Sequence, residues 1–303
     1  MADNFADRLM AAIREKSSRV CVGINPVWEK LPAPFAPASR APADAGRVVD
    51  AVRQFAQQIL VAVAPSCVAA KFNSAFFERL APTGLCLLTE LVSFARGLGL
   101  LTIADSKRAD VGSTAEAYAQ AAFGAYAAAD AAAAAVAPDA VTVNPYLGSD
   151  SVLPFIRAAV ARDAGVFVLV RTSNPSAAEI QDLVVEGGQP VYRRVADLVS
   201  AWGGDYLGAS GYSSVGAVVG ATWPRELSEL RQAMPHTPFL VPGYGAQGGG
   251  AADVVGAFDA QGMGGIVSSS RGIIYCSRGQ DFAQAAAQAA EDMRVEINRA
   301  LGM

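Results

Sequence analysis

The sequence is poor in charge, cysteine and histidine. Only 17% of its 303 residues are charged, and it holds four cysteines and one histidine. The cysteines, Cys21, Cys67, Cys86 and Cys276, are widely spaced without a Cys-x-x-Cys pair, so a disulfide framework or zinc site is not expected and small apolar packing is. His236 lies between two prolines with no nucleophile motif nearby, which nearly excludes a histidine-dependent triad.

Membrane, secretion and nucleic-acid signals are also missing. No apolar run reaches the roughly 18 residues of a membrane span, and the first 17 residues are typical of an amphipathic helix without a signal-peptide core. A cytoplasmic location and no membrane partner are therefore expected. The net charge of -4 without a basic cluster argues against nucleic acid as a partner. An anionic ligand would have to meet positive groups gathered locally.

What the chain does have is apolar residues, 52% of the total, in short β-branched runs. These runs are continuous rather than alternating, which is typical of parallel strands covered on both faces. The predicted strands span 19–26, 67–73, 100–107, 140–146, 165–173, 215–222, 239–243 and 264–270.

Segments with helical apolar spacing separate the predicted strands. They span 47–63, 83–97, 113–126, 151–163, 189–202, 224–234, 251–261 and 279–301. Eight such βα units predict a (β/α)8 barrel with an additional N-terminal helix, in one domain over residues 1–303. A doubly wound open sheet is the alternative, but no strand is followed by G-x-G-x-x-G and the regular repetition favours a closed barrel.

Two segments depart from this repeat. Residues 31–46 are rich in proline and alanine and resemble a linker, yet they fall inside the first βα unit, so an extended surface loop is expected. Residues 125–137 are dense in alanine, the best helix former, so a helix is expected there rather than disorder. Neither segment requires a domain boundary.

Charge gathers where the third predicted strand ends, in "IADSKRADVGST" from Ile103 to Thr114. Active sites of barrels lie at the carboxyl ends of the strands, and residues two apart on a strand share a face. Asp105 and Lys107 should therefore face the mouth together, and Lys71 at the end of the second strand could join them. A surface ion-pair network is the alternative; the end of a buried strand and the partner lysine favour a preorganised charged array.

The residues after Lys107 predict how the next helix begins. Ser113-x-x-Glu116 matches a capping box, which would start a helix near Thr114. Asp110 would then sit in the strand-to-helix turn, facing the mouth. Spacing gives Arg108 no role in the site, so an outward salt bridge is expected for it.

The last two strands predict an anion site. A glycine-rich loop, "VPGYGAQGGG", follows the seventh strand, and "SSSRGI" follows the eighth. Glycine lets backbone N–H groups approach an anion, and Arg271 can bind one bidentately. Either loop alone could serve only as a turn, but together with Arg271 and Gln247 they favour phosphate, which barrels commonly bind at these loops.

These motifs together resemble one family. "ADSKRADVGSTAEAYA" is similar to the D-x-K-R-x-D-x-G-x-T signature of the orotidine 5'-phosphate decarboxylases, and other segments resemble the longer bacterial-type (type 2) branch of that family in their usual order. They are "CVGINP", "KFNSAFFE", "VTVNPYLGSDSV", "VRTSNPSA", "VEGGQPVY", "VPGYGAQGG" and "SSSRGI".

The resemblance implies a homodimeric barrel that converts orotidine 5'-phosphate to UMP and CO2 in pyrimidine biosynthesis, without metal or organic cofactor. It implies that Lys107 protonates C6 of the pyrimidine and that Asp105 lies beside the substrate carboxylate. Lys71 and Asp110 would complete the charged array. The residues matching Asp110 and Thr114 would reach the active site of the neighbouring subunit.

The resemblance also implies how substrate binds. Thr172 and Ser173 would contact the pyrimidine, and Gln247 and Arg271 the phosphate. Asn73 and Gly243 join the expected substrate-binding residues, as does Asn25, which stands where the family usually has an aspartate that binds a ribose hydroxyl. An amide still hydrogen-bonds a hydroxyl but has no charge to couple to Lys71. Phosphate binding would help close the loops around 174–190 and 243–250.

Two other functions remain open from the sequence. A metal-dependent sugar-phosphate lyase or aldolase would share an Asp-x-Lys-x-x-Asp turn on the same barrel. A non-catalytic nucleotide-binding protein is suggested by Asn25 alone. Activity in the presence of a chelator opposes the first, and UMP binding without turnover supports the second.

Overall fold

The computed structural model describes residues 4–35, 44–124, 137–245 and 248–303. Eight parallel strands pair in sequence order and the last pairs with the first, forming a closed barrel. The strands are β1 (Val20–Ile24), β2 (Ala69–Asn73), β3 (Leu101–Arg108), β4 (Ala140–Val143), β5 (Gly165–Arg171), β6 (Val215–Val219), β7 (Phe239–Pro242) and β8 (Gly265–Ser269). The predicted barrel is confirmed, and all eight strands fall at the predicted positions.

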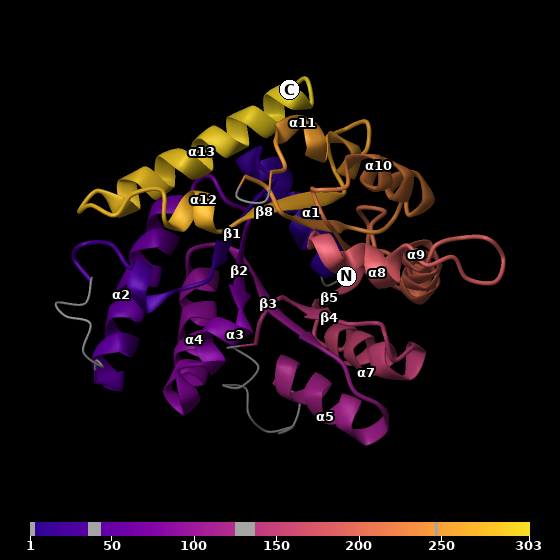
Figure 1. Ribbon diagram of the computed structural model, residues 1–303, viewed down its shortest axis with the longest axis horizontal. Coiled ribbons are helices and arrows are strands. Elements are labelled where there is room, and N and C mark those ends of the chain that lie inside the picture. Colours follow the sequence, from indigo (N-terminus) through magenta and orange to yellow (C-terminus); the bar gives the residue numbers. More distant parts are fainter. Residues whose placement is uncertain (1–3, 36–43, 125–136, 246–247) are drawn as a thin grey trace.

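Helices surround the barrel in Figure 1, and the long ones follow the strands as predicted. They are α2 (Ala45–Val63), α4 (Ala81–Gly97), α5 (Gly112–Phe123), α7 (Ser149–Val160), α9 (Val191–Gly203), α10 (Pro224–Ala233) and α13 (Phe282–Ala300). Shorter helical pieces lie in the connections. They are η1 (Trp28–Lys30), α3 (Ser74–Glu78), η2 (Pro175–Ala177), α8 (Ala178–Gln181), η3 (Gly204–Tyr206), α11 (Ala251–Val254), η4 (Val255–Ala257) and α12 (Arg271–Ile274).

The predicted N-terminal helix is present as α1 (Phe5–Lys16). Its apolar face, which includes Phe5, Leu9 and Ile13, packs with side chains from the barrel interior. The Phe5 ring lies edge-on to Phe167 of β5 at a centroid distance of 5.7 Å. Gly165 makes this approach possible, because a Cβ there would lie 2.2 Å from the Phe5 ring. The α1 helix therefore packs against the interior of the barrel and leaves the opposite end of the strands for a site.

One predicted helix is wrong in length and two segments lie partly outside the described residues. The expected helix over 251–261 ends early, as α11 followed by η4, and the backbone becomes extended at Phe258. In the turn that follows, the Asp259 carboxylate accepts hydrogen bonds from the backbone N–H groups of Gln261 and Met263, so the last residues of the expected helix form a turn instead. Most of the expected helix at 125–137 and the middle of the loop at 31–46 lie outside the described residues.

The cysteines are free thiols, but only two fit the predicted role. Cys21 and Cys67 are buried, whereas Cys86 and Cys276 are exposed. Packing in the core is therefore the wrong interpretation for the last two, which lie on helix α4 and just after α12.

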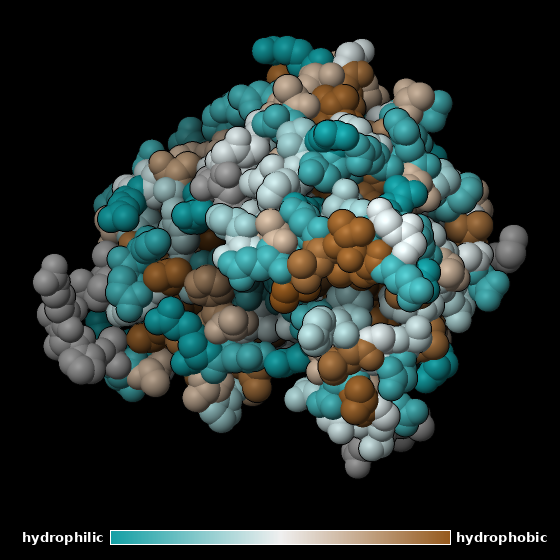
Figure 2. Space-filling view, turned by 45° about the vertical axis from the view of Figure 1, so that its right-hand side comes forward, coloured by the Kyte–Doolittle hydropathy of each residue, from teal (hydrophilic) through white to brown (hydrophobic). Residues whose placement is uncertain are grey.

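The surface shows where apolar residues are left uncovered. A compact hydrophobic patch interrupts a largely hydrophilic and mixed face in Figure 2. Among the described residues, Ile180, Leu183 and Val184 in and after α8 are each more than half exposed. No helix within the described ranges has both the length and the hydropathy needed to cross a membrane.

Candidate active site

A cavity of about 530 Å³ opens at the carboxyl ends of the strands. It collects residues from β1, β2, β3, β5, β6, β7 and β8, or from the turns that follow them, as expected for a barrel. The predicted site residues that line it are Asn25, Lys71, Asn73, Asp105, Lys107, Thr172, Ser173, Gly243 and Arg271. Asp110 and Thr114 are not among its lining residues, and Gln247 lies outside the described part of the chain.

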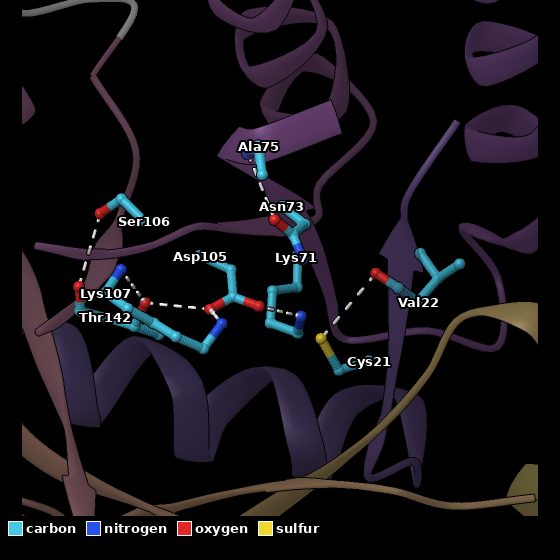
Figure 3. A network of polar contacts seen from close by, with 9 residues as sticks. All are labelled: Cys21, Val22, Lys71, Asn73, Ala75, Asp105, Ser106, Lys107 and Thr142. Carbon is cyan, nitrogen blue, oxygen red and sulfur yellow. Dashed lines mark hydrogen bonds and ion pairs between the residues drawn. The ribbon is translucent and has the colours of Figure 1, made fainter. Parts of the chain in front are cut away.

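Asp105 is the centre of the charged cluster (Figure 3). Its Oδ2 lies 2.6 Å from Lys71 Nζ, and its Oδ1 accepts a hydrogen bond from Lys107 Nζ. Thr142 of β4 donates its hydroxyl to the same Oδ1 at 3.0 Å. The pairing of β2 with β3 explains the contact between Lys71 and Asp105. Lys71 lies opposite Ile103, and Asp105 is two residues further along β3, where its side chain is on the same face of the sheet. Two cations and one hydroxyl therefore occupy a single carboxylate.

The surroundings of Asp105 fix its ionisation. Burial on its own would raise the pKa of this carboxyl, but the charges and hydrogen bonds of Lys71 and Lys107 outweigh burial and hold the pKa well below its usual range. Asp105 is therefore a carboxylate throughout the physiological pH range. Among the residues that the structure describes, no group of three or more His, Cys, Asp and Glu side chains is placed to hold a metal ion.

Lys107 reaches this cluster from an irregular backbone. The pairing of β3 with β4 shifts register between Ala104 and Arg108, and Lys107 has a φ of 48°, in the left-handed region. Its backbone N–H donates to the Thr142 hydroxyl at 2.9 Å. A lysine in this region costs about 1 kcal/mol or more, and such strain is common at functional sites. The regular strand geometry that would place Asp105 and Lys107 on the same face therefore does not continue through Lys107, although its ammonium still donates a hydrogen bond to Asp105.

The turn after β3 differs from the predicted capping box. Helix α5 begins at Gly112 with Val111 as its N-cap, and no side chain caps it, so the start near Thr114 with a Ser113–Glu116 box is wrong. The Asp110 carboxylate instead accepts the backbone N–H of Val111 at 2.8 Å, which orders the turn locally.

Arg108 points away from the cavity, as expected from its spacing. Its guanidinium pairs with Glu78 of α3 and lies 5.6 Å above the Tyr118 ring. Both partners are partly exposed, so the pair adds little to stability.

Two asparagines mark the side of the cavity formed by β1 and β2. The Asn25 Oδ1 is buried and has no hydrogen-bond partner among the described residues. Asn73 caps α3 by accepting the Ala75 N–H at 3.3 Å through its Oδ1. A buried, unpaired carbonyl oxygen is costly unless a ligand donates to it, so Asn25 is suited to accept a ligand hydroxyl.

The end of the cavity near β7 and β8 has the predicted features of an anion site. Gly243 has a φ of 104°, which favours glycine, and Arg271 is the first residue of the short helix α12. Tyr244 in the same loop donates its hydroxyl to Glu296 of α13 at 2.7 Å, so the loop is tied to the last helix.

Sequence reasoning missed three residues of the cavity region. Thr142 was hidden in an apolar strand, although its hydroxyl contacts both Asp105 and the Lys107 backbone. Tyr275 accepts the Val27 N–H at 2.7 Å and so fixes the loop after β1. Lys30 lines the cavity from η1. The only available signal was a polar residue near the end of a strand, and this signal does not reveal side-chain direction.

Fold and site together define a (β/α)8-barrel protein with a cation-rich pocket for an anionic ligand at the mouth of the barrel. The chain belongs to the Orotidine 5'-phosphate decarboxylase / HUMPS family, whose model matches residues 18–288.

Named relatives are similar over nearly their whole length. An orotidine 5'-phosphate decarboxylase of Rhodopirellula baltica is 47% identical over 282 residues, covering 93% of this chain and 92% of the relative. One from Deinococcus radiodurans is 40% identical over 304 residues, and the alignment covers 100% of this chain and 100% of the relative. The structure of Leishmania donovani OMP decarboxylase aligns with a TM-score of 0.75 at 29% identity, covering 99% of this chain and 100% of that one.

Proposed function

We propose that this protein decarboxylates orotidine 5'-phosphate to UMP and CO2, the reaction named for its relatives. The observation that carries the proposal is the Lys71–Asp105–Lys107 cluster at the mouth of the barrel. Among the described residues that line the cavity, four side chains are cationic, those of Lys30, Lys71, Lys107 and Arg271, and one is a carboxylate, that of Asp105. This excess of positive charge suits a substrate that carries both a carboxylate and a phosphate.

The chemistry requires one proton and a fixed electrostatic field. When the bond from C6 to the carboxylate breaks, its electron pair stays on C6 and CO2 leaves. An ammonium held beside C6 stabilises the developing carbanion and then donates its proton to that carbon, giving UMP and a neutral lysine that solvent reprotonates. Lys107 is suited to this role because it is the more exposed lysine, with a side chain 45% accessible against 7% for Lys71.

Asp105 and Lys71 have supporting roles in this proposal. Asp105 holds both ammonium groups in place, so that little reorganisation is needed during the reaction. Its carboxylate oxygens are already taken by two lysines and Thr142, an environment that disfavours a divalent cation. We therefore propose a reaction without metal or organic cofactor, rather than a metal-dependent lyase or aldolase.

The remaining contacts follow the position of each residue in the cavity. Arg271, Gly243 and the glycine-rich loop would bind phosphate, with Gln247 as a further contact. Asn25 and Asn73 would bind the ribose hydroxyls, and Thr172 and Ser173 the pyrimidine. The unpaired Asn25 Oδ1 supports binding of a hydroxyl by an uncharged acceptor. A single domain over residues 1–303, the longer bacterial-type branch and a cytoplasmic location complete the proposal.

The proposal is tested by analysing products. Purified protein incubated with orotidine 5'-phosphate should release UMP and CO2 in equal amounts, with Lys107→Ala protein prepared in parallel as the control for contaminating activity. Tight UMP binding without CO2 release would instead support a non-catalytic nucleotide-binding protein.

Arg271→Ala should weaken binding of UMP by about 10- to 100-fold while changing uridine binding little, because a charge-assisted contact to phosphate is lost. Calorimetric titration of both ligands measures this. Arg278→Ala, which removes an exposed arginine outside the cavity lining, is the matched control. Equal weakening of UMP and uridine would remove Arg271 from the phosphate site.

A homodimer with shared active sites accounts for Asp110 and Thr114. Asp110 lies in the turn before α5 and Thr114 in the first turn of that helix, and neither lines the cavity of its own chain. Val111 and Tyr118 nearby are 48% and 39% exposed, and Tyr146 after β4 is 79% exposed. Packing of this face against a second copy would remove these apolar side chains from water. A second copy of the chain would cover them, and Asp110 and Thr114 of the first copy would then reach the cavity of the second.

Mixing two inactive variants tests the shared site. Lys107→Ala and Asp110→Asn proteins should each be nearly inactive, but after subunit exchange their mixture should recover about a quarter of wild-type activity, because half of the dimers are mixed and each has one intact site. Absence of recovery, despite mixed dimers shown by mass spectrometry, would contradict sharing.

A further inference from the structure

The wall of the cavity formed by Thr172, Ser173 and Asn174 is held from behind by α8. The Gln181 side chain contacts Thr172 twice, accepting its backbone N–H at 3.0 Å and donating to its hydroxyl at 2.8 Å. The Thr172 hydroxyl in turn donates to Asn174 Oδ1 at 2.7 Å. The hydroxyl thus accepts one hydrogen bond and donates another within the protein, so its orientation depends on Gln181, and one acceptor lone pair is left for a ligand.

Apolar packing does little to hold α8 in place. None of its own residues is buried. Ile180 on this helix is 53% exposed, and Leu183 and Val184 just after it are 58% and 70% exposed. Because burial of apolar surface supplies most of the stability of packed elements, a helix without it depends on polar contacts for its position.

Arg171, the last residue of β5, supplies the anchor for these polar contacts. Its side chain is only 1% exposed, and its guanidinium lies 3.9 Å from the centre of the Trp223 ring and 5.2 Å from that of Tyr192. Nη1 lies 2.7 Å from Asp182 Oδ1 as an ion pair and Nη2 donates to Oδ2 at 3.2 Å, whereas Nε and Nη1 make no hydrogen bond among the described residues. An arginine this deeply buried is costly unless it is paired, so its carboxylate partner is strongly constrained.

Trp223 connects the same anchor to the cavity wall. Its indole N–H donates to the Thr172 carbonyl at 2.8 Å, while its ring covers Arg171. Thr222 adds a hydrogen bond from its hydroxyl to the Ser173 carbonyl at 3.2 Å. The wall residues are therefore fixed on one side by the turn between β6 and α10, and on the other by Asp182 and Gln181.

We propose that Arg171, stacked on Trp223 and paired with Asp182, is a positioning residue that holds α8 against the Thr172–Asn174 wall and so sets the affinity of the cavity for the base of a nucleotide. The inference rests on the proposed function, because it takes this wall as the one that contacts the pyrimidine. The phosphate end, with Arg271 and Gly243, comes from other strands and should be unaffected.

The test uses Asp182→Asn in the full chain, since Asp182 is 45% exposed and the change keeps its shape, whereas truncating the buried Arg171 could prevent folding. Glu229→Gln is the matched control: it makes the same change in the exposed Arg225–Glu229 pair on α10. Trp223→Phe is a second variant that keeps a ring over Arg171 but removes the indole donor.

Calorimetry would measure UMP, which has a base, and ribose 5-phosphate, which has none. We expect Asp182→Asn and Trp223→Phe to weaken UMP binding roughly tenfold and to change ribose 5-phosphate binding less than about twofold, while Glu229→Gln changes neither. In turnover assays the same variants should raise KM for orotidine 5'-phosphate more than they lower kcat.

Two results would overturn the inference. One is unchanged UMP binding in both variants; the other is equal weakening of UMP and ribose 5-phosphate, which would indicate general loosening of the barrel. Both readouts are binding measurements and do not need turnover. Failure of wild-type protein to bind UMP would count against the proposed function, whereas normal wild-type binding with unaltered variants would count against the positioning role alone.

Discussion

Lys107→Ala protein is expected to fold normally and to have a kcat more than about 10³-fold below that of wild type, because the change removes the proposed proton donor and with it the cation that would lie beside the developing carbanion. Folding should survive because this side chain is 45% exposed and Asp105 keeps Lys71 as a partner. Steady-state assays with orotidine 5'-phosphate, together with circular dichroism, measure both effects.

Two further variants separate charge from proton donation. Lys107→Arg keeps a positive charge but offers a guanidinium that does not give up its proton, so it should also be nearly inactive. Arg108→Ala removes the neighbouring cation, which points away toward Glu78, and should keep activity within about threefold of wild type. Lys107→Ala activity within about tenfold of wild type would exclude Lys107 as the proton donor.

Asp105→Asn should lower kcat by about 10²-fold or more, because the two ammonium groups lose the carboxylate that positions them. The same change should also destabilise the fold by up to about 3 kcal/mol, since Lys71 is 7% exposed and would lose its buried counter-ion. Kinetics and urea unfolding at neutral pH measure the two effects.

The stability difference should depend on pH in a defined direction. The folded-state pKa of Asp105 is held below the ordinary value of 3.8, so its stabilising contribution is present above that pH and is lost as the pH falls toward the folded-state pKa. Wild type and Asp105→Asn should therefore differ by a constant amount from pH 7 to about pH 5 and converge only below about pH 4. A difference that disappears already at pH 6 would contradict the assigned ionisation.

The fold was predictable because its signal is repeated in every unit. Strands such as β1 and β6 are buried along their whole length, so the runs Val20–Ile24 and Val215–Val219 are continuously apolar and contrast with the helical spacing between the strands. The prediction failed for the helix expected over 251–261, whose end depends on the structure of a single turn. The helix begun at Ala251 ends at Val254 and gives way to η4 and to a turn ordered by the Asp259 carboxylate, and residue types alone do not show which of these structures is preferred.

The site was predictable to the level of which strand ends carry charge. Lys71 and Asp105 could be placed together because neighbouring parallel strands end at the same edge of the barrel. The positive φ of Lys107 and the double contact of Thr142 depend on a local shift in the pairing of β3 with β4, which residue types do not specify. Asp110 and Thr114 do not line the cavity, so their assignment to a site rests on the proposed dimer.

The most direct test of the account is turnover of orotidine 5'-phosphate by purified wild-type protein in excess EDTA, followed through the ultraviolet absorbance of the pyrimidine. We expect conversion to UMP at the same rate with and without the chelator, because the proton donor and its electrostatic support come from Lys107, Asp105 and Lys71. An unchanged spectrum without chelator would contradict the proposed activity, and activity lost on chelation would contradict the proposed mechanism.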